Sequence, residues 1–251
     1  MYKILTNTEF IGKNIIYLPK CHSTNDIASD LMKKDNLTEG SVVITDQQLS
    51  GRGQRGNECL TEAGQNLTFS IVLKPDFLDI AHNFHLNIFV SLAIRDYLGA
   101  ILGNSVKIKW PNDIYYQNSK ICGILIENFL KGHFISQTIV GIGLNVNQNY
   151  FPISNATSLY QITHQIFDLK HALGNLVEYL EKRYLQLKMD QLDQLQDDYY
   201  QNFYWMGEEH VFKSDQEFAG IIKGIDESGR LIIETGKQEK SFDLKEITFV
   251  R

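Results

Sequence analysis

Hydrophobic residues follow two different spacings along this chain. Apolar positions that recur every three or four residues predict amphipathic helices at 83–102, at 168–189 and from 192 to about 203. A further helix, carrying Ile27, Ala28, Leu31 and Met32, is expected after capping residues at 23–26. Alternating or continuous apolar runs predict strands at 14–18 (ending at Pro19), 41–45, 67–73, 106–109, 113–116, 121–128 and 134–145.

The last fifty residues show no helical spacing. Their short alternating runs, separated by turns such as 226–229 and 235–237, predict five short strands and hence a small β-barrel. We therefore expect two domains, residues 1–204 and residues 205–251. Because so short a segment has a thin hydrophobic core, the second domain should pack against the first.

Composition narrows the class of protein. Hydrophobic residues make up 43% and charged residues 22%, which is typical of a folded globular chain. The formal net charge of −6 is opposite to that of a general nucleic-acid binder, so any cationic site must be local. The three cysteines lack metal-site spacing and favour reduced thiols. No run reaches the ~18 consecutive apolar residues of a membrane span, so we expect a cytoplasmic protein without a membrane partner.

A cationic, glycine-rich segment lies between two predicted strands. It consists of Gly51, Arg52, Gly53, Gln54, Arg55 and Gly56. Glycine lets the backbone approach a small group closely, and arginine binds carboxylates and phosphates through two parallel hydrogen bonds. No Gly-Lys-Ser/Thr follows, so the spacing differs from the Walker phosphate loop. The segment favours an anion site over the alternative, an exposed turn with solvated arginines.

Three more segments place polar residues at the ends of predicted strands. Residues 109–113 (Lys-Trp-Pro-Asn-Asp) hold a cation and a large ring at a stiff turn. Lys120 opens an apolar strand, which is costly unless a negative group faces it. Residues 141–147 end a strand with two glycines and two asparagines, whose amides can pair with an adenine edge. Each segment alone has an equally good structural explanation, namely a tryptophan buried for packing at 110, a snorkelling lysine at 120 and a glycine-containing bulge at 141–147. The convergence of all these segments on strand ends of one sheet favours a shared site.

Together these motifs resemble those of the biotin–protein ligases (biotin–acetyl-CoA-carboxylase ligases), from about Ile16 to the C-terminus. The resemblance rests on five ordered segments, which are Ser23-Thr24-Asn25, Gln47 with 51–56, 109–113, Lys120 with 123–127, and 141–147. It implies an α+β fold with a mixed, largely antiparallel sheet and helices, similar to class II aminoacyl-tRNA synthetases. A small C-terminal Src-homology-3-like β-barrel should follow this sheet.

The resemblance also implies an activity. Such enzymes join biotin and MgATP into biotinyl-5′-AMP, releasing pyrophosphate, and then pass biotin to one lysine of a biotin carboxyl carrier protein. The alternatives are a lipoate or octanoate ligase and a non-catalytic, biotin-sensing repressor. Only about 14 residues precede the first predicted strand, and with the acidic charge this argues against a DNA-binding domain and a DNA partner. A homodimer is a further expectation.

The resemblance assigns roles to individual residues. The expected catalytic residues are Lys120, Arg52 and Arg55. The expected biotin-binding residues are Ser23, Thr24, Asn25, Gln47, Gly51, Arg52, Gly53, Gln54, Trp110, Lys120 and Gly123. The expected ATP-binding residues are Arg52, Arg55, Lys109, Trp110, Asn112, Asp113, Lys120 and Asn145. Mg²⁺ should accompany ATP, with Asp113 as the single candidate protein ligand.

Two positions depart from the family pattern. Gln54 stands where the family usually has arginine, which removes one charge that faces phosphate. Cys59 stands where the family often has tryptophan, so packing beneath the glycine-rich segment should be looser. We therefore expect this chain to retain the adenylate less tightly, with Arg52 and Arg55 carrying more of the phosphate contact.

Overall fold

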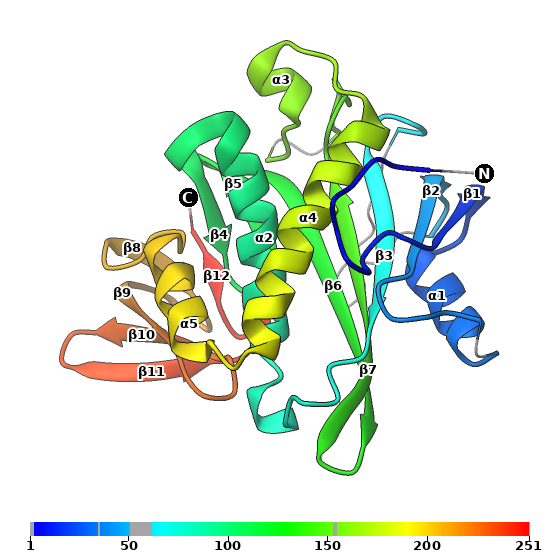
Figure 1. The fold of residues 1–251 in the computed structure, drawn as a ribbon. Coiled ribbons are helices and arrows are strands. Elements are labelled where there is room, and N and C mark those ends of the chain that lie inside the picture. Colours follow the sequence, from blue (N-terminus) through cyan, green and yellow to red (C-terminus); the bar gives the residue numbers. More distant parts are fainter. Residues whose placement is uncertain (1–2, 35, 51–61, 153–154, 251) are drawn as a thin grey trace.

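The computed structural model describes residues 3–34, 36–50, 62–152 and 155–250 of the chain (Figure 1). Its strands are β1 (Ile15–Cys21), β2 (Val42–Gln48), β3 (Leu67–Leu73), β4 (Val106–Lys109), β5 (Asp113–Tyr116), β6 (Ser119–Lys131), β7 (Phe134–Leu144), β8 (Glu209–Lys213), β9 (Glu217–Ile225), β10 (Leu231–Thr235), β11 (Gln238–Phe242) and β12 (Thr248–Phe249). Its α-helices are α1 (Thr24–Met32), α2 (His85–Leu102), α3 (Leu159–Thr163), α4 (Leu169–Lys188) and α5 (Leu192–Gln201).

Two sheets organise the described chain. The larger has seven strands in the order β1-β2-β3-β7-β6-β5-β4, and the smaller has five in the order β11-β10-β9-β8-β12. In the larger sheet β1 pairs in parallel with β2, whereas the other neighbours are antiparallel. The smaller sheet is antiparallel throughout. This arrangement confirms the predicted α+β class, with a mixed, largely antiparallel sheet and a separate C-terminal β unit.

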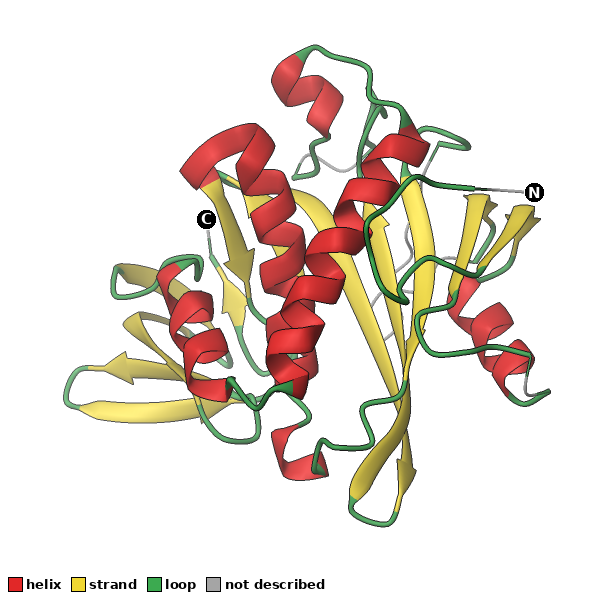
Figure 2. Ribbon diagram, viewed as in Figure 1, coloured by secondary structure: helices red, strands yellow, loops and turns green. Residues whose placement is uncertain are grey.

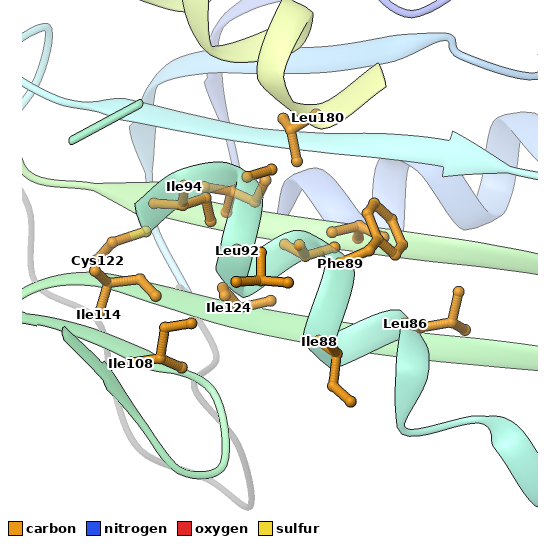
Figure 3. Packing of buried hydrophobic residues seen from close by; sticks show 14 of the residues in the cluster. Leu86, Ile88, Phe89, Leu92, Ile94, Ile108, Ile114, Cys122, Ile124 and Leu180 are labelled. Atoms are coloured by element: carbon orange, nitrogen blue, oxygen red, sulfur yellow. The ribbon is translucent and has the colours of Figure 1, made fainter. Parts of the chain in front are cut away.

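Helices cover the larger sheet unequally. Helices α2 and α4 lie side by side over one face, and α1 lies apart from them against β2, β3 and β7 (Figure 2). The main hydrophobic cluster fills the space between α2, α4 and the sheet, and it includes Leu86, Phe89 and Leu92 of α2 with Ile114 and Ile124 of the strands (Figure 3). Burying each such side chain contributes roughly 1.5–3 kcal/mol, so this layer supplies most of the hydrophobic stabilisation.

Helix α2 is apolar on nearly all sides because it is enclosed by the sheet and α4. The segment 80–105 is long and apolar enough to cross a membrane by length and composition, and it alone meets that test among the described residues. Ten residues of α2 are nevertheless buried inside the protein, including Leu86 and Phe89. A helix that is apolar all round belongs either to a core or to a membrane, and these contacts show a core helix.

A second, smaller cluster lies under α1. Ala28 and Met32 of this helix pack against Val43, Val72 and Ile139, which come from β2, β3 and β7. The central strands are therefore covered on both faces where α1 lies. This explains why all seven residues of β3 are buried and why its sequence is continuously apolar rather than alternating.

The observed elements differ from the predicted ones in several places. Strand β2 extends to Gln48, and β6 runs from Ser119 to Lys131, both beyond their predicted bounds. Strand β1 continues through Pro19 to Cys21, so the predicted end at Pro19 was wrong. Within the described chain β1 pairs with β2 alone, and proline is tolerated on such an edge strand because no ladder bond needs its missing N–H. Helix α3 was not predicted, since its five residues bury only Leu159 and show no period. Helix α5 ends at Gln201 rather than near 203.

The C-terminal sheet shares the main hydrophobic core. Phe212 and Leu231 of this sheet belong to the same cluster as Tyr199 of α5 and Phe84, which precedes α2. Gly229, at φ +83°, lies so close to the Phe84 ring that a Cβ atom would overlap it. The two sheets thus share one hydrophobic core, which suits a small β unit with little core of its own.

Candidate active site

A cavity of about 660 Å³ opens where the N-terminus of α1, the β4–β5 hairpin, β6 and β7 come together. Ten of the predicted site residues line it, namely Ser23, Thr24, Asn25, Lys109, Trp110, Asn112, Asp113, Lys120, Gly123 and Asn145. The motifs singled out in the sequence therefore converge in space. The predicted residues Gly51, Arg52, Gly53, Gln54 and Arg55, and the family departure at Cys59, lie outside the described residues.

Lys120 and Asp113 form an ion pair inside this cavity. The Lys120 Nζ lies 2.6 Å from Asp113 Oδ1, and both side chains are partly exposed to the cavity. Burial alone would lower the pKa of Lys120, but the Asp113 carboxylate outweighs it and raises that pKa. The ammonium group is therefore charged at neutral pH. Asp113 is the negative group that the sequence led us to expect opposite this lysine.

Gly123 leaves room for this lysine. A Cβ atom at position 123 would lie 3.2 Å from both Cε and Nζ of Lys120, and 3.8 Å from Asp113 Oδ1. The backbone of Lys120 is held as well, because its N–H donates to the Asn155 carbonyl at 2.7 Å. The position of the ammonium group is thus set by both its backbone and its ion pair.

Lys109 lies between two aromatic rings at another wall of the cavity. Its Nζ is 4.8 Å from the centre of the Tyr115 ring and 4.7 Å from that of Phe249, both within the range of a cation–π contact. It also donates to the Tyr115 hydroxyl at 3.3 Å. The sequence predicted that Lys109 faces an anion, and these contacts place its charge at the cavity wall.

Trp110 and Asn112 hold the β4–β5 hairpin against its surroundings. Trp110 is buried, follows a strand of the large sheet, and donates from Nε1 to the Gly229 carbonyl of the C-terminal unit at 2.8 Å. Asn112 donates from Nδ2 to the Ile124 carbonyl, and the Ile124 N–H returns a bond to Asn112 O at 2.9 Å. Both residues line the cavity, but each also carries a structural bond that the sequence did not reveal.

The N-terminus of α1 forms the most polar end of the cavity. Ser23 is the N-cap of α1, so the predicted capping role is confirmed, and it also lines the cavity. Ser23, Thr24 and Asn25 are each at most 4% exposed, so their polar atoms must be satisfied by the protein or by a ligand. Capping and a place in the cavity coexist at Ser23, as the resemblance implied.

The cavity contains Gln48 rather than Gln47. Gln48 Oε1 accepts from the Thr24 backbone N–H at 2.9 Å, and it lines the cavity, whereas the predicted Gln47 does not. Adjacent residues of a strand point to opposite faces, and the sequence does not show which face of β2 carries the site. The role predicted for Gln47 is thus better matched by its neighbour.

Two glycines of β7 keep the cavity floor open. Gly141 lies under Asn25, and a Cβ there would overlap Asn25 Oδ1. Gly143 also lines the cavity, and no atom lies within 4 Å of the position a Cβ would take. Asn145 comes directly after the end of this strand and donates from Nδ2 to the Thr157 carbonyl at 2.9 Å, which fixes the plane of its amide.

The C-terminal unit supplies a wall that the sequence analysis missed. Leu244, Lys245, Ile247, Thr248 and Phe249 all line the cavity. These residues come from the end of a short β unit that carries no recognisable chemical motif, so no signal in the sequence links them to the site. The hydrogen bond from Trp110 to the Gly229 carbonyl connects the C-terminal unit to the larger sheet.

The chemistry of the lining suits an anionic substrate that also has a polar head group. The lining combines hydroxyl and amide groups at α1, the Lys120 ammonium group and apolar residues such as Trp110 and Leu125. No cluster of three or more histidine, cysteine, aspartate or glutamate residues that could hold a metal occurs in the described chain. Asp113 supplies the carboxylate of the described lining, and Lys120 is its partner.

Comparison with known proteins identifies the family. The family model "Biotin/lipoate A/B protein ligase family" matches residues 17–145, and "Biotin protein ligase C terminal domain" matches residues 211–247. A biotin–[acetyl-CoA-carboxylase] ligase from Paracoccus denitrificans is 30% identical over 227 residues, covering 86% of this chain and 92% of that protein. The bifunctional ligase/repressor BirA of Bacillus subtilis is 32% identical over 70% of this chain, a match that spans only 55% of the relative.

A solved structure shares the whole fold. The biotin protein ligase from Aquifex aeolicus, in complex with biotin and ATP, superposes with a TM-score of 0.78 at 29% identity, covering 95% of this chain and 99% of that one. Both the catalytic and the C-terminal family models match, in the order that the two sheets show. On these grounds the chain belongs to the biotin/lipoate A/B protein ligase family and, within it, to the biotin protein ligases.

Proposed function

We propose that this chain activates biotin with MgATP to biotinyl-5′-AMP and then transfers biotin to a lysine of a biotin carboxyl carrier protein, such as that of acetyl-CoA carboxylase. The observation that carries the proposal is one cavity whose lining contains both hydrogen-bonding groups at the N-terminus of α1 and a charged lysine, Lys120. The Aquifex relative binds biotin and ATP, and the Paracoccus relative is named for the carboxylase, which supports both substrates.

In the first step a biotin carboxylate oxygen attacks the α-phosphorus of ATP, and the bond to the leaving pyrophosphate breaks. Two anions must approach one another, so their repulsion has to be reduced first. Lys120 is held in place and charged before the substrates arrive, and such a preorganised cation stabilises the charge that builds on the α-phosphate. We expect Arg52 and Arg55 to add to this field, which the sequence motif supports.

The substrates are arranged along the cavity in the order of their chemistry. Ser23, Thr24 and Asn25 hold the ureido end of biotin, with Gln48 beside them. Trp110 contacts the valeryl chain. Lys109, Asn112 and Asn145 belong to the nucleotide half, with Asn145 facing adenine.

Magnesium fits this site as a companion of the nucleotide. Mg²⁺ in such enzymes is held by one or two carboxylates together with substrate phosphates and water. Asp113 is the one carboxylate of the described lining, and Lys120 neutralises it. Mg²⁺ would therefore be held mainly by the phosphates, whose charge it would reduce, with Asp113 as a single protein ligand.

In the second step the amine of the carrier lysine attacks the acyl carbon and AMP leaves. This chain then needs no nucleophile of its own, because the carrier provides it. Excluding water from the adenylate protects the mixed anhydride from hydrolysis. We further propose that the chain acts in the cytoplasm, without DNA, and that a homodimer forms, which size-exclusion chromatography with light scattering would test.

The decisive experiment incubates the chain with biotin, MgATP and an isolated carrier domain, followed by intact-mass spectrometry of the carrier. One added biotin is the expected result, and it should require ATP. An unmodified carrier would refute the proposal. Parallel reactions with lipoate and octanoate test the alternative within the same family, since their transfer in place of biotin would assign the chain to lipoate chemistry.

A further inference from the structure

A chain of hydrogen bonds runs behind the α1 end of the cavity. Ser70 Oγ lies 2.7 Å from Thr24 Oγ1 and 2.6 Å from Asn25 Oδ1, and Asn25 Nδ2 donates to Glu127 Oε2 at 2.7 Å. Thr24 and Asn25 line the cavity, whereas Ser70 and Glu127 lie behind them. Ser70 is fully buried, and Glu127 is partly exposed. This series of hydrogen bonds thus connects Thr24 and Asn25, which line the cavity, to Ser70 and Glu127, which do not.

The carboxylate of Glu127 sets the direction of these bonds. A carboxylate only accepts hydrogen bonds, so Asn25 must turn its NH₂ group to Glu127 and its oxygen to Ser70. The Asn25 oxygen also only accepts, so Ser70 uses its single proton there. In the 2.7 Å contact between the two hydroxyls, only Thr24 has a proton left to donate, and Gln48 Oε1, 3.3 Å from the same hydroxyl, competes for it. The Thr24 proton is used inside the protein in either case.

This direction decides what the cavity offers to a ligand. Thr24 and Asn25 present oxygen lone pairs, and the Asn25 oxygen lies directly over the cavity glycine Gly141. Ser23 Oγ accepts from the Asp26 N–H at 3.4 Å, so its own proton points away from the helix end. Acceptors next to a donor match a cyclic urea, in which N–H groups flank a carbonyl.

We propose that Ser70 and Glu127 are positioning residues that orient Thr24 and Asn25, and thereby give this end of the cavity its preference for a urea head group. The proposal rests on the proposed function, because the urea is the head group of biotin. It assigns selectivity against an apolar head group, such as a dithiolane, to two residues that do not contact the ligand.

The first test removes one hydroxyl and measures binding by calorimetry on the intact chain. Ser70→Ala removes the hydrogen bond that holds the Asn25 oxygen and the partner of the Thr24 hydroxyl, and losing one oriented hydrogen bond should weaken biotin binding about tenfold. ATP affinity should stay within about twofold, since the nucleotide half is untouched. Thr138→Val is the matched control, because it removes an equally buried hydroxyl that bonds Asn128 Oδ1 at 2.7 Å outside the cavity lining.

The second test changes Glu127, the partly exposed end of this series of hydrogen bonds. Glu127→Met removes the acceptor and should weaken biotin binding about tenfold. Glu127→Gln keeps an acceptor at the same distance and should restore affinity to within about threefold. Octanoate has no urea, so its inhibition should be unchanged in both Ser70→Ala and Glu127→Met. The affinity for biotin relative to that for octanoate should therefore fall.

Each outcome has a clear meaning. Unchanged biotin affinity in Ser70→Ala and Glu127→Met overturns the proposal. So does an equal loss for biotin, octanoate and ATP, or an equal loss in Thr138→Val, because a purely structural role predicts these results. A wild-type chain that binds biotin but forms no biotinyl-AMP refutes the proposed function instead, and calorimetry separates the two cases because it needs no turnover.

Discussion

Gly141 is the residue at which the smallest change should disturb the site most. Alanine there would place a Cβ against Asn25 Oδ1, closer than the ~3 Å that real contacts reach, so the Asn25 side chain must rotate. Rotation breaks its bonds to Ser70 and Glu127. The first bond is worth about 1 kcal/mol and the second, to a charged group, about 1.5–3 kcal/mol.

The net cost is smaller than that sum. Replacing glycine by alanine also restricts the unfolded chain, which stabilises the protein by about 0.4–1 kcal/mol. We therefore expect Gly141→Ala to lower the free energy of unfolding by about 2–3 kcal/mol, or the melting temperature by roughly 5–10 °C for a chain of this size. Biotin affinity should fall at least tenfold, since Asn25 lines the cavity.

Gly143→Ala provides the control for this prediction. It lies two residues further along the same strand and face, and its Cβ would meet no atom within 4 Å. Calorimetric melting of both variants without ligand should show an unchanged or slightly higher melting temperature for Gly143→Ala. Equal melting temperatures for the two variants would refute the reasoning, because they would show that Asn25 is not held in its present position.

Three further predictions concern charge and the C-terminal unit. Lys120→Met should lower the rate of pyrophosphate release on the order of 10²–10³-fold, whereas Lys107→Met, outside the cavity, should leave it unchanged. Because Asp113 raises the Lys120 pKa, the stability from this pair is complete below the ordinary lysine value of 10.5 and is lost as pH rises through the higher folded pKa. Asp113→Asn should therefore move the alkaline limb of the adenylation rate to lower pH, and an unmoved limb would show that Lys120 does not control it. Gly229→Ala and Gly236→Ala both force alanine to positive φ, but only the former overlaps a phenylalanine ring. Thermal denaturation should therefore show that Gly229→Ala lowers the free energy of unfolding by about 1–3 kcal/mol more than Gly236→Ala does. Equal losses in the two variants would contradict the packing of Gly229 against Phe84.

Local patterns predicted most of the fold. The strands 67–73, 106–109 and 113–116 have the bounds that their apolar runs predicted, and the long helices α2 and α4 differ from prediction by at most two residues at either end. Burial of one face imposes a period on neighbouring residues, so this information is carried within each segment. The end of β1 was predicted wrongly because a strand tolerates proline only on the side that has no partner strand. Which side of β1 has a partner is decided by the order of strands in the sheet.

The site divides in the same way. Four motifs can be recognised from neighbouring residues alone. They are the helix cap at 23–25, the stiff turn at 109–113, the lysine on an apolar strand at 120 and the paired glycines at 141–145. Which of two adjacent glutamines enters the cavity, what pairs with Lys120, and that Phe249 closes a wall followed only from the folded chain. These are contacts between segments far apart in sequence, and their partners are set by how the sheets and helices pack, which no local period records.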